Sequence, residues 1–238
     1  MPPRAAISNF IMTVVILFFM LMLGMLLKAR YRLPSESKGE TEDAVPKAIP
    51  VAIPVEETVY ETRAYKEGDW WVLPHPELVV SRASEPDTLR IRSGPKEDVF
   101  TLYFVDAAET TWMRPRRLRD QAEFFRKTPD DQVIEAGTKA LGWVTDLLSK
   151  RPFTVYTKWG RVPETERYYA FIKVEVEPGK FEDLGEMLVR RGYASPAGQQ
   201  TRPMPESLPP VERYITSLGK AMAQAKAERT GLWHVVTP

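Results

Sequence analysis

The chain has 238 residues and a formal net charge of +1, so its bulk charge gives no sign of a nucleic-acid partner. It contains no cysteine, which excludes disulfides, thiolate catalysis and cysteine-ligated zinc. Its two histidines, His75 and His234, lie far apart in the sequence and give little support to a histidine zinc site or a Ser-His-Asp triad.

The N-terminal part has the pattern of a membrane anchor. Residues 10–27 form an uncharged apolar run that would span roughly 27 Å as a helix, about the thickness of the hydrocarbon core of a bilayer. The run ends in basic residues without a small-residue cleavage site, unlike a signal peptide. We therefore expect a flank at residues 1–9 and one transmembrane helix at residues 10–28 that contacts the lipid bilayer.

Residues 29–64 are predicted to be a flexible linker. Their four prolines, with acidic and hydroxyl side chains between them, favour extended conformations over a fold. The simplest interpretation is a spacer without a partner of its own, followed by a globular domain over residues 65–238.

A β-hairpin is predicted near the start of this domain. Residues 88–92 and 99–105 alternate between apolar and polar side chains, and the segment between them carries Gly94 and Pro95. With the turn centred on residues 96 and 97, Leu89 would face Phe104, Ile91 would face Leu102, and Asp87 would face Asp106. Two opposed carboxylates suit a hard divalent cation such as Ca²⁺ or Mg²⁺, although acidic side chains at strand ends are commonly just solvated.

A basic cluster follows the hairpin and leaves two interpretations open. It could bind phosphate groups beside the carboxylates, or it could be the solvated face of a loop and helix. The cluster consists of Arg114, Arg116, Arg117 and Arg119.

Helical periodicity marks three later segments. Residues 129–149 start with Thr128 as a predicted N-cap, residues 181–191 stop before Gly192, and residues 211–228 stop before Gly231. Strands are expected at residues 153–158 and 167–176, with a loop at 159–166. Strands grouped with about three helices predict an α+β domain built on a small, mostly antiparallel barrel.

Several stretches in this order resemble the staphylococcal nuclease (thermonuclease-like) family, over about residues 78–234. They are Pro86-Asp87-Thr88, Val105-Asp106-Ala107-Ala108-Glu109-Thr110, Arg167-Tyr168-Tyr169-Ala170-Phe171, residues 184–194 and residues 227–233. The resemblance implies a five-stranded OB-fold barrel with about three helices and a Ca²⁺-dependent phosphodiesterase site at the edge of the barrel.

The resemblance also implies roles for individual residues. Asp87 and Asp106 match the calcium-binding carboxylates, and the backbone carbonyl of Ala107 would be a further ligand. Glu109 matches the glutamate that accepts a proton from the attacking water or orients it. Arg167 matches the second catalytic arginine, with Arg161 as its rival because the loop between them makes the alignment ambiguous.

One departure from the family lies on the hairpin itself. Thr101 stands where the family has an arginine that helps to clamp the phosphate, and a hydroxyl group supplies no charge. In the expected register Arg92 faces Thr101 and Arg90 is its diagonal neighbour. Either arginine could reach the phosphate instead, or both could simply decorate the outer face of the strand.

The leading hypothesis is a membrane-anchored nuclease-like hydrolase that cleaves single-stranded DNA or RNA with a calcium ion, its soluble domain being a monomer. The alternative is a catalytically impaired OB-fold module that binds nucleic acid or protein, because Thr101 replaces the catalytic arginine. The family resemblance favours export of the domain to the periplasm or exterior. The basic residues after the anchor would instead keep it in the cytoplasm, so the orientation stays open.

Overall fold

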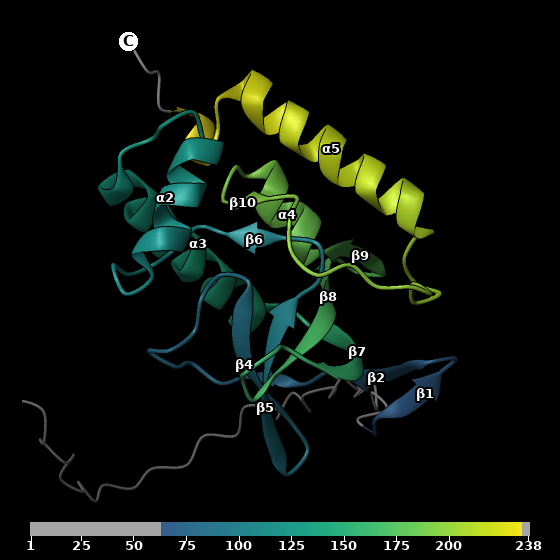
Figure 1. The fold of residues 1–238 in the computed structure, drawn as a ribbon. Coiled ribbons are helices and arrows are strands. Elements are labelled where there is room, and N and C mark those ends of the chain that lie inside the picture. The colour runs from purple at the N-terminus through teal and green to yellow at the C-terminus, as the bar shows by residue number, and fades with distance from the viewer. Residues whose placement is uncertain (1–62, 235–238) are drawn as a thin grey trace, which may run out of the picture. The chain divides into compact units, whose positions relative to one another are not determined.

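A computed structural model describes residues 63–234 of the protein (Figure 1). The predicted flank, the transmembrane helix and nearly all of the linker lie outside these residues. Within residues 63–234, no helix combines the length and the apolarity needed to cross a membrane.

The described part is a mixed α+β structure with a largely antiparallel sheet (Figure 1). Eight strands form this sheet in the order β1-β2-β7-β8-β5-β4-β3, with β9 paired to β8. Its only parallel pair joins β5 to β8, and no pairing between the described end strands β1 and β3 closes the order into a barrel. The strands are β1 (Tyr65–Glu67), β2 (Trp70–Pro74), β3 (Glu77–Leu78), β4 (Thr88–Ser93), β5 (Lys96–Leu102), β7 (Phe153–Arg161), β8 (Arg167–Glu177) and β9 (Lys180–Asp183).

The predicted hairpin exists, but its predicted register is wrong. Leu89 lies opposite Phe100 rather than Phe104, and Arg92 lies opposite Glu97 rather than Thr101. The turn is the two-residue segment Gly94-Pro95, where Gly94 adopts a φ of 60° that favours glycine. Because the error is an even number of residues, each side chain stays on its expected face, and Leu89, Ile91, Phe100 and Leu102 are all buried.

Four helices are described, one more than the sequence indicates. They are α2 (Pro115–Phe124), α3 (Asp130–Lys150), α4 (Leu184–Arg190) and α5 (Val211–Glu228), followed by the short 3-10 helix η1 (Gly231–His234). The basic cluster forms much of α2, which the periodicity did not reveal. The segment expected as one helix from residue 181 instead begins as β9, since pairing with β8 extends to Asp183.

Two boundaries also differ from the predicted ones. The N-cap of α3 is Pro129 rather than Thr128, whose buried hydroxyl donates to the Phe125 carbonyl instead. Strand β7 continues to Arg161, so the connecting loop is shorter than expected.

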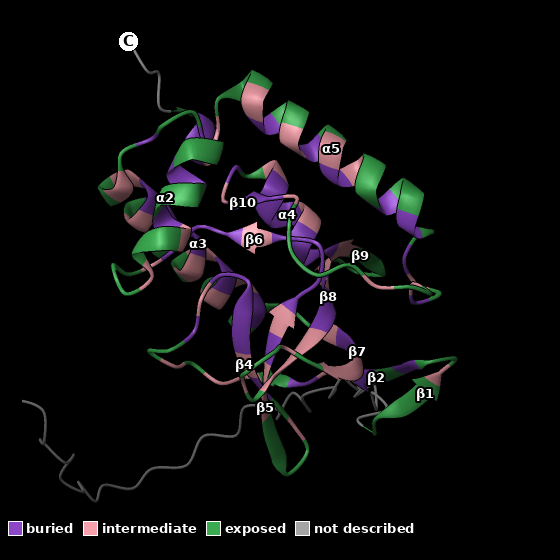
Figure 2. Cartoon of the chain, viewed as in Figure 1, coloured by how far each residue is buried: buried purple, intermediate pink, exposed green. Residues whose placement is uncertain are grey.

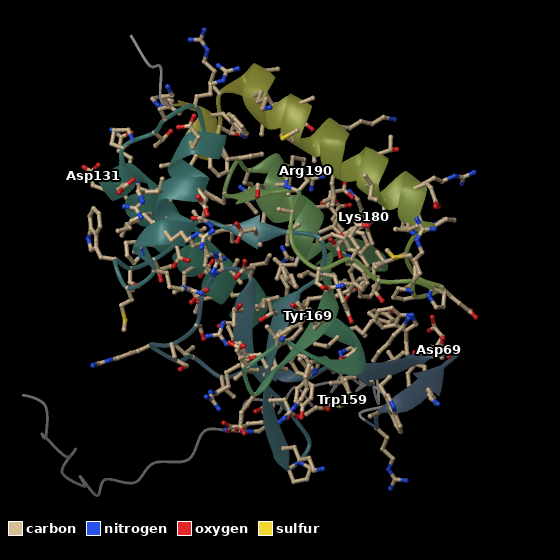
Figure 3. All side chains as sticks on the ribbon, in the orientation of Figure 1. Asp69, Asp131, Trp159, Tyr169, Lys180 and Arg190 are labelled. Atoms are coloured by element: carbon tan, nitrogen blue, oxygen red, sulfur yellow. The ribbon has the colours of Figure 1, made fainter. Side chains whose placement is uncertain are left out.

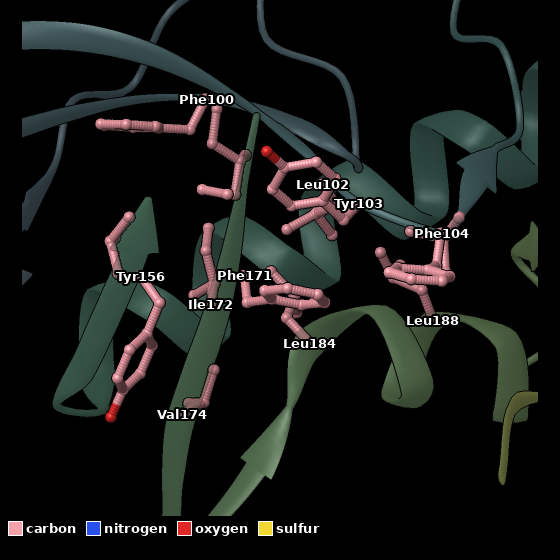
Figure 4. Close-up of a cluster of buried hydrophobic side chains, with 14 of the residues drawn as sticks. Phe100, Leu102, Tyr103, Phe104, Tyr156, Phe171, Ile172, Val174, Leu184 and Leu188 are labelled. Carbon is pink, nitrogen blue, oxygen red and sulfur yellow. The ribbon is translucent and has the colours of Figure 1, made fainter. Parts of the chain in front are cut away.

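Two hydrophobic clusters hold the elements together. The larger one joins the inner face of the sheet to α3, α4 and α5, and Figure 4 shows Phe100, Phe104, Phe171 and Leu188 within it. The smaller one, which we call the α2 cluster, contains Leu118, Phe125, Val133, Leu232 and Trp233 together with neighbouring small residues. Buried and exposed residues alternate along α5, as Figure 2 shows, because one face of this helix packs into the larger cluster.

A separate two-stranded sheet pairs β6 (Asp106–Ala107) with β10 (Ala194–Ser195). The chain leaves β5 after Leu102 and passes through Phe104 at a φ of 64° before it enters β6. Strand β6 therefore carries two of the expected ligands away from the main sheet and towards α2.

Candidate metal and phosphate site

The carboxylates singled out from the sequence meet at the start of β4 and at β6. Asp87 directly precedes β4 and is 3% exposed. Its backbone carbonyl accepts a hydrogen bond from Leu102 N at 2.8 Å, and its Oδ2 accepts one from Ala107 N at 2.8 Å. These two bonds place Asp87 beside Asp106 and Ala107, although the three residues are not partners in the hairpin ladder.

Arg117 on α2 lies at the centre of this group. Its Nη2 atom contacts Asp87 Oδ2 at 3.4 Å and the Ala107 carbonyl at 3.4 Å, and it donates a short hydrogen bond to Asp106 Oδ1. All three oxygen donors implied for calcium thus converge on one nitrogen atom. The guanidinium also reaches Glu109, with Nη1 3.0 Å from Oε1.

Arg114 and Glu85 complete the cluster. Arg114 pairs with Glu85 through a short contact and lies 3.0 Å from Glu109 Oε2. Neither Glu109 oxygen forms a hydrogen bond, because the guanidinium nitrogens lie within ion-pair distance but outside hydrogen-bond geometry. The side chain of Glu109 is 0% exposed, so the two arginines separate it from solvent.

Gln121 fixes the backbone of the site. Its Oε1 accepts a hydrogen bond from Glu109 N at 2.9 Å, and its Nε2 donates to the Ala107 carbonyl at 2.7 Å and to Asp106 Oδ2 at 3.2 Å. Arg117 and Gln121 lie about one turn apart on one face of α2, and Arg114 is its N-cap residue, so the first part of this helix presents two guanidinium groups and one amide to the carboxylates. The backbone of Glu109 also lies against α3, where Gly137 leaves room for the Glu109 carbonyl.

Burial and the neighbouring arginines shift the pKa values of these carboxyl groups in opposite directions. Burial raises the pKa of Asp87 to about 6, against the effects of Arg117 and the Ala107 N–H. Burial likewise raises the pKa of Glu109, again opposed by Arg117 and Arg114. Burial also tends to raise the pKa of Glu85. This effect is outweighed by the hydrogen bond and the charge of Arg114 and by the charge of Arg117, so the pKa of Glu85 is lowered.

A cavity of about 340 Å³ opens beside the cluster. Arg114, Arg117 and Arg167 all line it, together with Asp87 and Asp106. Its wall also includes Thr101 and Tyr169, which are partners in the β5–β8 ladder, and Figure 3 shows Tyr169 on β8. Three guanidinium groups around one opening suit an anionic ligand such as a phosphate.

The other candidate arginines lie elsewhere. Arg92 pairs with Glu97 and Glu77 at the turn end of the hairpin, so the idea that it faces Thr101 is wrong. Arg90 lies opposite Val99 and is the diagonal neighbour of Thr101, as predicted, but it lines a smaller cavity of about 220 Å³ that it shares with Arg167. Arg161 stacks over the Tyr168 ring at 5.9 Å and does not line the larger cavity.

Sequence reasoning did not assign Arg114, Arg117 and Gln121 to the carboxylates. The sequence predicts either that this basic cluster binds phosphate beside the carboxylates or that it forms the solvated face of a loop and helix, and neither interpretation pairs its arginines with the carboxylates. The spacing of 114, 117 and 121 was the available signal, because it predicts one helical face that carries only side chains able to bond carboxylates and carbonyls.

The donors fit a hard cation by their chemistry, since two carboxylates and one carbonyl supply oxygen only. Between residues 63 and 234, no group of three or more acidic, histidine or cysteine side chains is arranged around a common metal position. The point on which the three oxygens converge is held by Arg117 Nη2.

No protein-family model matches the sequence, and no curated protein matches it significantly.

Proposed function

We propose that the domain is a nuclease-like phosphodiesterase that acts on single-stranded DNA or RNA with a bound Ca²⁺ ion. The observation that supports this most is the convergence of Asp87, Asp106 and the Ala107 carbonyl on one point at the wall of a cavity that Arg167 also lines. Carboxylates for a cation and arginines for a phosphate are the two requirements of phosphoryl transfer by positioning and electrostatics.

In this proposal the fold is a partly open OB barrel. The mostly antiparallel strand order, which no pairing between the described end strands β1 and β3 closes, is compatible with it, because OB folds are Greek-key barrels that remain partly open. The strand that begins at Arg167 and the strand that ends at Leu102 then bring the arginine and Thr101 to the same opening.

In the proposed reaction, different residues bind the cation, bind the phosphate and accept the proton. Asp87, Asp106 and the Ala107 carbonyl would hold the cation, which supplies positive charge to the phosphate oxygens. Arg167 would donate hydrogen bonds to a non-bridging oxygen, and Glu109 would accept a proton from the attacking water. Glu109 reaches water only if Arg114 and Arg117 leave it, because both guanidinium groups cover its carboxylate.

That covering favours a second candidate function. A module that binds nucleic acid or protein without cleavage needs no exposed general base, and Thr101 lacks the charge of the family's arginine. Thr101 instead shares a hydrogen bond with Thr88 at an Oγ1–Oγ1 distance of 3.1 Å.

Cleavage separates the two candidates. Purified full-length protein is incubated with labelled single-stranded DNA and RNA, either with Ca²⁺ or with EDTA. We expect calcium-dependent cleavage that falls by roughly 10²-fold or more in Glu109→Gln, since a positioned general base contributes about 10²–10⁴-fold. Binding without cleavage by the unaltered protein would reject the enzyme and support the binding module.

We propose further that residues 10–28 anchor the protein in a lipid bilayer and that the domain acts as a monomer on the exported side. Protease treatment of intact cells tests the orientation, because only an exported domain is digested from outside. Protection of the domain until the cells are lysed would place it in the cytoplasm.

A further inference from the structure

We infer that Arg117 and a divalent cation compete for one position among Asp87, Asp106 and the Ala107 carbonyl, and that the cation displaces Arg117 into the cavity, where it supplies the positive charge that Thr101 lacks. The second half of this inference rests on the proposed function; the competition for the site does not.

The competition follows from the position of one atom. Arg117 Nη2 is within contact distance of Asp87, Asp106 and the Ala107 carbonyl. A cation bound by these oxygens needs them at about 2.3–2.6 Å for Ca²⁺. A guanidinium nitrogen and a cation cannot share that space, so each excludes the other.

Gln121 keeps the oxygens in place when Arg117 leaves. Its amide holds the Ala107 carbonyl and Asp106 Oδ2, and it is itself 4% exposed. The Ala107 N–H holds Asp87. These bonds do not involve Arg117, so the ligand geometry survives its departure.

Charge favours the exchange. Glu85, Asp87, Asp106 and Glu109 surround Arg114 and Arg117, so negative charge exceeds positive charge in the cluster. A divalent cation compensates the carboxylates at least as well as one guanidinium does. Arg117 then becomes available to an anion.

The displaced side chain has a place to go. Arg117 is 28% exposed and already lines the cavity together with Thr101 and Arg167. A phosphate in this cavity would meet Arg167 from β8 and Arg117 from α2. Arg117 would thus serve in place of the arginine that the hairpin lacks.

The test compares full-length protein with Arg117→Met and with the matched control Arg119→Met, an exposed position on the same helix. Calcium binding is measured by calorimetry, and thymidine 5′-monophosphate binding is measured in saturating Ca²⁺. We expect Arg117→Met to bind Ca²⁺ about tenfold or more tightly than the unaltered protein, and the nucleotide about tenfold more weakly. The control should change neither.

Equal or weaker Ca²⁺ binding by Arg117→Met would overturn the inference. Tighter Ca²⁺ binding with unchanged nucleotide binding would overturn the role in phosphate binding, because Arg117 would then only obstruct the site. If Arg117→Met does not fold in EDTA, recovery of its melting transition on addition of Ca²⁺, beyond any shift of the unaltered protein, supports the competition. If Arg117→Met remains unfolded with Ca²⁺, Arg117→Lys takes its place and is expected to shift both affinities in the same directions, and unchanged affinities would overturn the inference.

The proposed nuclease activity can be rejected without rejecting the competition between Arg117 and Ca²⁺. Tighter Ca²⁺ binding by Arg117→Met, together with no cleavage by the unaltered protein, would reject the activity and leave the competition for the site standing.

Discussion

Among single residues, Asp183 is a buried carboxyl group that is not part of the carboxylate cluster of the candidate site. Its Oδ1 caps α4 by accepting from Glu186 N at 2.9 Å and also accepts from Tyr214 Oη at 2.7 Å, while Oδ2 has no hydrogen-bond partner. Burial raises its pKa from 3.8 to about 6 despite these two bonds. The folded protein therefore holds this proton more tightly than the unfolded chain does.

This difference predicts a pH-dependent stability. Because the folded-state pKa is raised, the contribution of Asp183 to stability is fully present below about pH 4 and is lost as the pH rises through about 6. Relative to Asp183→Asn, the free energy of unfolding of the unaltered protein should fall by about 2–3 kcal/mol between pH 4 and pH 7. Urea denaturation at both pH values measures it.

The exposed Asp120 provides the control for this experiment. Asp120→Asn should leave the difference between the two pH values unchanged. A constant difference between the unaltered protein and Asp183→Asn across this range would contradict the raised pKa.

The sequence predicts some residues of the candidate site and misses others. Asp87, Asp106, Ala107 and Arg167 were selected from the sequence and line or adjoin one cavity. The spacing of Arg117 and Gln121 indicates a shared helical face, but it does not say that this face meets the carboxylates, because that contact depends on how α2 packs. The hypothesis about Arg92 depended on the hairpin register and failed with it.

At the scale of elements, α3 passes so close to the candidate site that only glycine fits at position 137. A Cβ atom there would lie 2.2 Å from the Glu109 carbonyl oxygen and 2.6 Å from that of Ala108. Both are backbone atoms, so the clash cannot be relieved by a change of rotamer. The close approach sets the position of the segment that carries Glu109.

We therefore expect Gly137→Ala to lower the free energy of unfolding by about 1–3 kcal/mol, because it overpacks this contact. Gly142→Ala on the same helix is the matched control, since nothing lies within 4 Å of its added Cβ. The control should raise stability by roughly 0.5–1 kcal/mol through helix propensity. Urea denaturation distinguishes the two, and a stabilising Gly137→Ala would show that α3 is not held against Glu109.

The elements that the sequence predicts best are those with strong periodicity. Helix α5 has the predicted limits, and α3 differs from its predicted limits by one residue. Helix α2 was missed because arginine-rich turns hide its few buried positions, chiefly Leu118, Gln121 and Ala122. The start of α4 was misjudged because strand pairing with β8, a tertiary contact, prevails over local propensity.

At the scale of the whole described structure, the C-terminal end packs against the helix that carries Arg117. Trp233 of η1 lies 4.8 Å from Phe125 between ring centroids, and Lys226 lies over its ring at 4.4 Å. Trp233 is part of the α2 cluster, which also contains Val133 of α3. The position of α2 over the carboxylates thus depends on residues more than a hundred positions away in the chain.

Trp233→Ala should therefore cost about 3–5 kcal/mol of stability, as truncations of large buried aromatic side chains do. It should also make the chain between residues 111 and 128 more susceptible to limited proteolysis. Trp233→Phe is the milder control, because the indole N–H has no hydrogen-bond partner to lose. If Trp233→Ala lowers the stability but does not speed proteolysis between residues 111 and 128, then the packing of α2 does not depend on Trp233.

The α+β class follows from the alternating strands and periodic helices, whereas the pairing order required long-range contacts. The parallel pairing of β5 with β8 joins segments separated by all of α2, α3 and β7. No local pattern specifies such a pairing, because it depends on which faces the helices cover.

The backbone of Ala107 is held on both sides. Its N–H donates to Asp87 and its carbonyl accepts from Gln121, so side chains from two different segments fix the peptide units before and after this residue. The conformational entropy of this acceptor is lost when the chain folds, and little remains to be lost when a ligand approaches it. The site is preorganised, and the cost of ordering it belongs to folding rather than to binding.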